Sequence, residues 1–104
     1  MHTVMWTFQV PEGTSKDSLR QTIKATAHTY QGIPGLIRKY YLLSQDGNAA
    51  GGVYLWKSRE DAERLYSDNW KAFILEKYEA RPFVTYFDTT VVVDNLTHQI
   101  IADD

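Results

Sequence analysis

The most constraining feature of the sequence is the segment 50–66, AGGVYLWKSREDAERLY, in which an apolar run passes directly into a charged one. Residues 53–56 are β-branched, aliphatic or aromatic and follow two glycines, a pattern typical of a strand. Ser58 precedes Asp61 by three residues, so its hydroxyl can accept a backbone N–H of the first helical turn. Glu60 and Asp61 suit the positive end of a helix. The segment therefore predicts a strand that leads straight into a helix.

The remaining elements follow from hydrophobic periodicity and turn residues. Residues 2–10 alternate between apolar and polar side chains, as a half-buried strand does. A Thr14 or Ser15 cap predicts a helix to about Tyr30, ended by the Gly and Pro residues of 32–35. Further along, the pattern predicts a strand over 36–44 and a turn at 45–48. The second helix is expected to break near 67–69, and a further helical piece carries Trp70, Phe73, Ile74 and Tyr78 and ends before Arg81–Pro82. A fourth strand is predicted over 83–93.

The resulting order, β-α-β-β-α-β, predicts an α+β fold of the ferredoxin-like type. Its four-stranded antiparallel sheet would carry both helices on one face. With 104 residues the chain is expected to be a single domain, 1–104, in which 94–104 is a tail too polar to cover the other sheet face. A second copy of the chain is the simplest way to cover that face, so we expect a homodimer.

Composition excludes several classes of protein. A net charge of -2 argues against a nucleic-acid binder, which usually carries a basic face. No apolar run approaches the roughly 20 residues that cross a bilayer, so no membrane association is expected, and the N-terminus lacks the layout of a signal peptide. The absence of cysteine removes thiol chemistry, and cytoplasm is the expected compartment. Aromatic content of 13% exceeds what a small core needs, which favours an interface or a ligand pocket.

Three matches give the chain a family resemblance: the connection Gly32–Leu36, Lys39 among strand aromatics, and the segment 50–56 with the capped helix after it. On these residues the chain resembles the dimeric α/β-barrel superfamily, and within it small mono-oxygenases of the antibiotic-biosynthesis-monooxygenase type. The resemblance implies two sheets facing each other across a dimer and a pocket between each sheet and its helices. In several members a tryptophan matching Trp56 borders that pocket. Haem-degrading relatives carry a histidine on the second helix, and none occurs between Ser58 and Tyr78, so no cofactor is expected.

Mono-oxygenation without a cofactor requires an electron-rich substrate whose deprotonated form donates an electron to oxygen. The protein must supply a dry aromatic pocket, a group that takes a proton and donors for the anionic oxygen. A lysine near apolar groups can act as the base. The predicted catalytic residues are Lys39, Tyr54 and Trp56, and the predicted substrate-binding residues are Trp6, Phe8, Tyr41, Trp70 and Phe73. No histidines have metal-ligand spacing, so no metal site is predicted.

Each of these residues also has a plain structural interpretation. The tryptophans and Phe8 alternate or step as ordinary core residues do, and Lys39 could be a solvated strand lysine. The leading hypothesis is a cofactor-independent mono-oxygenase acting on a phenolic or polyketide-like aromatic small molecule. Three alternatives stay open: a non-catalytic aromatic-binding protein, an isomerase or cyclase on the same scaffold, and a dimerisation scaffold with a collapsed pocket.

Overall fold

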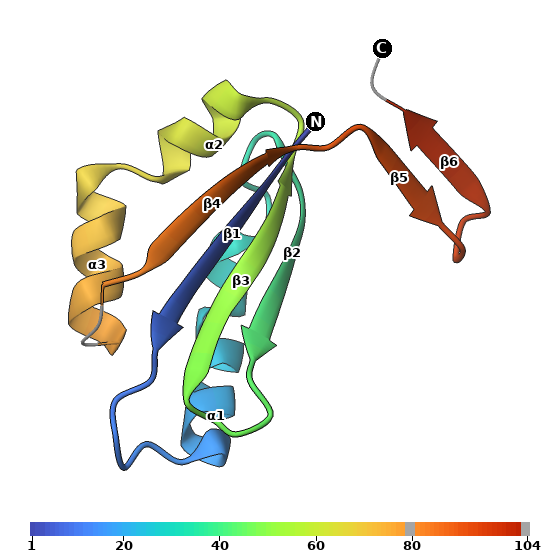
Figure 1. Cartoon of the computed structure of the whole chain (residues 1–104). Helices are drawn as coiled ribbons and strands as arrows, with labels where there is room; N and C mark the ends of the chain where they lie inside the picture. The colour runs from blue at the N-terminus through green and yellow to red at the C-terminus, as the bar shows by residue number, and fades with distance from the viewer. Residues whose placement is uncertain (79–80, 103–104) are drawn as a thin grey trace.

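The computed structural model describes residues 1–78 and 81–102 (Figure 1). Its elements follow the predicted order as far as the fourth strand and then depart from it. They are β1 (His2–Gln9), α1 (Lys16–Thr26), the 3₁₀ turn η1 (Ala27–Tyr30), β2 (Leu36–Leu43), β3 (Ala49–Trp56), α2 (Arg59–Leu65), α3 (Asp68–Tyr78), β4 (Phe83–Asp88), β5 (Val91–Asp94) and β6 (Gln99–Ala102).

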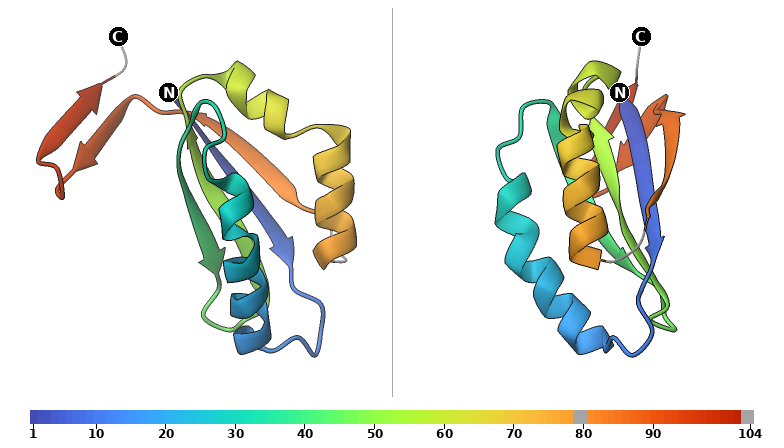
Figure 2. Two further views of the ribbon diagram at one scale, coloured as in Figure 1. Left: turned by 180° about the vertical axis from the view of Figure 1, so that it is seen from behind. Right: turned by 90° about the vertical axis from the view of Figure 1, so that its left-hand side faces the viewer.

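Within the described residues, β1 to β4 form one antiparallel sheet in the order β2-β3-β1-β4. The helices α1 and α3 lie on the same side of it, as Figure 2 shows. This confirms the predicted ferredoxin-like α+β fold. No helix in the described part of the chain combines the length and the hydropathy needed to cross a bilayer.

The joint between β3 and α2 forms as the sequence predicts. Ser58 Oγ accepts the backbone N–H of Asp61 at 3.2 Å and donates to Asp61 Oδ2 at 2.8 Å. The predicted break in the second helix is also present, because α2 ends at Leu65 and α3 begins at Asp68. The Ser67 side chain accepts the backbone N–H of Trp70 at 3.2 Å and so caps α3.

The core lies between the sheet and the helices in two clusters. The larger one joins the inner faces of β1 and β3 to α2 and to Tyr66, the residue that follows α2. Trp56 and Val4 are fully buried there. The smaller one packs Phe8 and Ala50 against Leu19 of α1. Alternation along β1 and β3 therefore sorts side chains by face as predicted.

The predicted fourth strand, 83–93, is wrong in its extent. β4 pairs with β1 only as far as His2↔Asp88, with one more bond from Thr89 N to Met1 O at 2.9 Å. The β-branched run that follows pairs instead with its own continuation, so β5 and β6 form a separate hairpin (Figure 1). Part of the tail predicted over 94–104 is therefore a strand, and its last two residues lie outside those described.

The second face of the sheet exposes large apolar side chains. Tyr40 is 53% exposed, Phe83 73% and Phe87 48%. The register pairs Lys39 with Tyr54 and Val4 with Tyr86, so the intervening residues of β2 and β4 point away from the helices. We refer to this surface, with Leu42, as the open sheet face.

Candidate functional site

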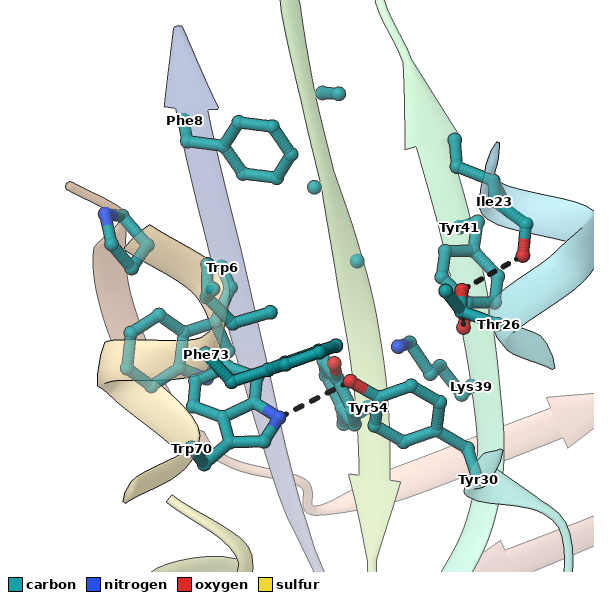
Figure 3. A pocket seen from close by; sticks show the side chains of 15 residues that line it. Trp6, Phe8, Ile23, Thr26, Tyr30, Lys39, Tyr41, Tyr54, Trp70 and Phe73 are labelled. Carbon is teal, nitrogen blue, oxygen red and sulfur yellow. Dashed lines mark hydrogen bonds between the residues drawn. The ribbon is translucent and has the colours of Figure 1, made fainter. Parts of the chain in front are cut away.

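A cavity lies between the sheet and the helices α1 and α3, and we refer to it as the inner cavity (Figure 3). It has about 490 Å³ of space including its mouth, of which about 30 Å³ admits a water-sized sphere. Its walls are aromatic and aliphatic. In the described part of the chain they are Trp6, Phe8, Ile23, Thr26, Tyr30, Lys39, Tyr41, Ala50, Gly51, Gly52, Tyr54, Trp70, Phe73, Ile74 and Pro82.

Seven of the eight predicted site residues line this cavity. They come from β1, β2, β3 and α3, and they are Trp6, Phe8, Lys39, Tyr41, Tyr54, Trp70 and Phe73. These elements are distant in the sequence, so the fold alone brings the side chains together.

Trp56 is the exception and does not belong to the lining. Its side chain is fully buried, and its Nε1 donates to the hydroxyl of Tyr66 at 3.1 Å. It stacks on Tyr54 with ring centroids 6.2 Å apart. The predicted role as a donor facing a substrate has no support in this geometry, because the indole N–H already has a partner inside the core.

The tryptophans pack against aromatic neighbours rather than enclosing a large void. The rings of Trp6 and Trp70 meet edge-to-face with centroids 4.6 Å apart, and Tyr66 lies 4.9 Å from each. The small free volume of the inner cavity follows from this contact.

Lys39 points into the site, on the sheet face that carries the helices. Its Nζ lies 3.2 Å from the ring centroid of Tyr30, 3.9 Å from that of Tyr41 and 4.5 Å from that of Tyr54. No carboxylate among the described residues pairs with it. Burial lowers the pKa of the Lys39 amine to about 7, because desolvation disfavours the charged form. A substantial fraction of the side chain is therefore neutral near pH 7.

Two of the tyrosines around Lys39, Tyr41 and Tyr54, have phenols that burial keeps protonated. Burial raises the pKa of the Tyr54 phenol far above its usual range, and the neighbouring Tyr30 and Tyr66 raise it further. Burial also raises the pKa of Tyr41, whose hydroxyl lies 3.2 Å from Thr26 Oγ1. Neutral phenols in such a site are hydrogen-bond donors.

Sequence reasoning missed Tyr30 and Thr26 as site residues. The sequence pattern marks Tyr30 only as the last step of the first helix, yet its hydroxyl accepts the indole N–H of Trp70 at 3.1 Å across 40 residues (Figure 3). Its position on η1, after α1 ends, turns the ring over Lys39. A tyrosine at the end of an amphipathic helix is the signal that could have indicated it.

The glycine pair of β3 has two separate functions in packing. A Cβ at Gly51 would collide with the backbone carbonyl of Trp6, so the glycine permits the close approach of β1. A Cβ at Gly52 would lie 3.2 Å from Tyr54 Cε1 and 3.3 Å from Lys39 Cε. Gly52 therefore leaves the space into which Lys39 folds.

Comparison with protein families shows which family the chain belongs to. The profile described as "Putative mono-oxygenase ydhR" matches residues 5–95. The chain belongs to this mono-oxygenase family. No curated protein sequence matches the chain.

Solved structures share the fold of this ydhR-family chain. A cofactor-independent oxygenase, SnoaB from Streptomyces nogalater, is 18% identical, with a TM-score of 0.65 over 88% of this chain and 95% of its own. The mono-oxygenase ActVA-Orf6 of Streptomyces coelicolor, solved with Nanaomycin D, is 18% identical, with a TM-score of 0.65 over 85% and 86%. A mutant of MhuD with two manganese protoporphyrin IX bound per active site is 17% identical, with a TM-score of 0.69 over 91% and 100%.

The ydhR-family cavity does not fit a macrocycle of the kind bound by MhuD. Its free volume is about that of one water molecule, far less than a porphyrin ring occupies, and within the described residues its lining contains no His, Cys or Met. Across residues 1–78 and 81–102, no group of three or more His, Asp or Glu side chains is placed to hold a metal ion.

Proposed function

We propose that the protein is a cofactor-independent mono-oxygenase that acts on an electron-rich, phenolic or polyketide-like aromatic small molecule. The observation that carries this proposal is the Lys39 amine, which is held against tyrosine rings in an aromatic cavity with a pKa of about 7. Membership of a mono-oxygenase family supports the reaction class. The shared fold of SnoaB, a cofactor-independent oxygenase, and of ActVA-Orf6, solved with Nanaomycin D, supports the type of chemistry and of ligand.

The chemistry needs only a base, a dry site and oxygen. Neutral Lys39 takes a proton from the substrate, and the resulting anion donates an electron to O₂. At a methylene between aromatic rings, one oxygen atom becomes a carbonyl and the other leaves as water with both hydrogens, so no external reductant is required. In this proposal the phenol of Tyr54, kept protonated by its raised pKa, donates to the anionic oxygen.

The inner cavity must widen before a bicyclic substrate can enter it. The side chain that permits this is Phe73, which lines the cavity from α3 and is 46% exposed. Rotation of an exposed side chain is fast compared with turnover. We therefore assign Phe73 to the mouth of the site and Trp6 with Trp70 to its inner wall.

Oxygen uptake with a panel of anthrones and dihydroxynaphthalenes tests the proposal. We expect uptake by the wild-type protein that rises with pH through about 7 as Lys39 loses its proton. Lys39→Met should reduce the rate by roughly 10²-fold or more, the typical contribution of a general base. The matched control is Lys57→Met, because that lysine does not line the cavity.

The alternatives give different results in the same assays. Turnover of the panel without oxygen would identify an isomerase or cyclase that uses the same base. Saturable quenching of tryptophan fluorescence without product would identify a binding protein. Uptake that is equal in wild-type and Lys39→Met would remove the assigned base, and no uptake with any compound would contradict the mono-oxygenase proposal.

We also propose that the protein is a homodimer through its open sheet face. Exposed Tyr40, Phe83 and Phe87 form an apolar surface on the side of the sheet opposite the helices. Soluble monomers rarely leave a large apolar patch uncovered. When a second copy presents the same face, the two apolar surfaces cover each other, and the interface is symmetric.

A further inference from the structure

A second depression, the outer hollow, adjoins the inner cavity between η1 and β2. Its volume is about 640 Å³, and it opens to solvent. Tyr30, Lys39 and Tyr41 line both spaces, so Lys39 stands at the boundary between them. Figure 3 shows the Lys39 side chain beside the rings of Tyr41 and Tyr30. The approach to Lys39 from the outer hollow does not pass the packed tryptophans, because neither Trp6 nor Trp70 lines that hollow.

The amine at this boundary is held in place but is chemically uncommitted. Tyr30 is anchored by the Trp70 indole at 3.1 Å, and the Tyr41 hydroxyl lies 3.2 Å from Thr26 Oγ1. These two rings flank Nζ at 3.2 and 3.9 Å from their centroids. No hydrogen bond or ion pair within the described residues engages Nζ. Its lone pair, when the amine is neutral, is free to attack an electrophile.

We propose that Lys39 is also a nucleophile, which forms an imine with an aromatic aldehyde bound in the outer hollow. The lysine nitrogen attacks the aldehyde carbon, and a carbinolamine forms as one N–H proton passes to the oxygen. Loss of that oxygen as water, with the second N–H proton, leaves a C=N bond. Atoms balance without an oxidant or a reductant, so this activity is independent of oxygen chemistry.

The charge of the outer hollow indicates which aldehydes it favours. Its lining includes Lys24, His28 and Arg38 and no acidic residue. Arg38 forms an ion pair with Asp94 at 2.7 Å, which leaves Lys24, on α1, without an ion pair among the described residues. An aldehyde with a carboxylate on its ring matches this surface better than a neutral one does. We therefore infer a preference for anionic aromatic aldehydes.

The titration that governs the reaction is that of Lys39 itself. The groups that face it from neighbouring elements are the phenols of Tyr30, Tyr41 and Tyr54, and the hollow adds Lys24, His28 and Arg38. Burial favours the neutral form of the Lys39 amine. Labelling at Lys39 should therefore rise through about pH 7, whereas labelling of an ordinary exposed lysine rises only toward about pH 10.

Reductive trapping tests the proposal with the intact protein under nitrogen. The probe is 4-formylbenzoate with cyanoborohydride at pH 7.5, and its methyl ester is the neutral comparison. Peptide mapping should find the main lysine adduct at Lys39, formed on the order of several hundred-fold faster than at surface lysines, since at this pH most of the Lys39 amine but only about 0.1% of an ordinary lysine amine is neutral. The ester should label more slowly than the acid.

Two variants keep the test decisive. Lys39→Arg retains the cation but cannot form an imine, so its adduct should vanish while its unfolding temperature shows that it is folded. Tyr30→Phe keeps the ring over the amine and should retain labelling. Labelling spread over the lysines in proportion to their exposure, or unchanged in Lys39→Arg, would overturn the proposal. Because oxygen is absent, trapping and oxygen uptake are read separately. Oxygen uptake that depends on Lys39, without an adduct, would overturn the imine alone, and an adduct without oxygen uptake would overturn the oxygenase proposal alone.

Discussion

At the scale of single residues, Lys39 is unusual, because its amine lies among tyrosine rings and no carboxylate of the described residues pairs with it. The ring faces of Tyr30 and Tyr41 attract the charged amine by cation–π interaction, which offsets part of the free energy lost on desolvation. Burial nevertheless lowers the pKa to about 7. A residue of this kind lowers folding stability in its charged form, and a strongly shifted pKa in a cavity marks it as a candidate for a functional site.

The lowered pKa of Lys39 predicts a pH-dependent stability. In the unfolded chain lysine titrates near about pH 10.4, so between about pH 7 and 10 the unfolded state binds the extra proton. The free energy of unfolding of wild-type, relative to Lys39→Met, should therefore rise across this window, by at most about 1.4 kcal/mol per pH unit. Urea denaturation of both proteins at several pH values measures this difference. If the free energies of unfolding of the two proteins changed in parallel with pH, the result would contradict the lowered pKa.

At the scale of elements, the β3–α2 joint connects the core to the site. β3 presents Tyr54 to the cavity and Trp56 to the core two residues later, because both point to the same sheet face. The Ser58 cap then starts α2 at once, which brings Ala62 and Tyr66 over Trp56. A loop in place of this cap would leave the indole N–H of Trp56 without its Tyr66 partner.

Ser58→Ala should lower the free energy of unfolding by about 1 kcal/mol, with a range of about 0.5–2 kcal/mol, because the Asp61 N–H loses its acceptor. Chemical denaturation measures the change. Ser15→Ala is the matched control, since Ser15 caps α1 by the same contact with Ser18 N at 3.1 Å. Both losses should be similar, but only Ser58→Ala should alter the fluorescence of the folded protein through Trp56. Equal spectra for the two variants would argue against the coupling of cap and core.

The glycine pair predicts opposite results for two neighbouring substitutions. Gly51→Ala should destabilise the fold strongly, by about 3 kcal/mol or more, because its methyl group would meet the backbone of β1. Gly52→Ala should cost less in stability but displace Lys39 and so slow both labelling and turnover. Thermal unfolding and the trapping assay separate the two effects. The reverse ranking of stabilities would contradict the packing described for β3.

At the scale of the whole molecule, the β5–β6 hairpin projects from the body and extends it to 45 Å in its longest dimension (Figures 1 and 2). The radius of gyration is 14.6 Å, against about 13 Å for a compact chain of this length. The hairpin exposes Val93 and Ile100, while Asp94, at its turn end, is buried against Arg38 of β2. An apolar arm anchored beside an apolar sheet face extends the surface proposed for the second copy.

Charge placed on the open sheet face should separate the proposed dimer. Phe83→Glu, introduced at a residue that is 73% exposed, should shift sedimentation equilibrium at micromolar concentration from dimer toward monomer, because the carboxylate would be buried at the interface. Leu75→Glu on α3, at a residue that is 42% exposed, is the matched control and should leave the dimer intact. A wild-type monomer at this concentration would remove the dimer proposal.

The sequence alone predicted the elements that local patterns control. Alternation placed Val4, Trp6 and Phe8 on one face of β1, and the Ser58 cap located the joint of β3 and α2, since each depends on neighbours within a few residues. The same reasoning selected seven of the lining residues, because aromatic side chains on inward positions of a half-covered sheet converge under its helices.

The tertiary structure decided what depends on partners distant in the chain. Whether Thr89–Val93 continued β4 depended on where β1 stopped pairing, which no local pattern shows. The removal of Trp56 from the site depended on the Tyr66 hydroxyl, and the lowered pKa of Lys39 depended on its burial between elements that are distant in the sequence. Periodicity determines which face a side chain occupies, whereas the groups it meets there, and hence its chemistry, depend on how separate elements pack.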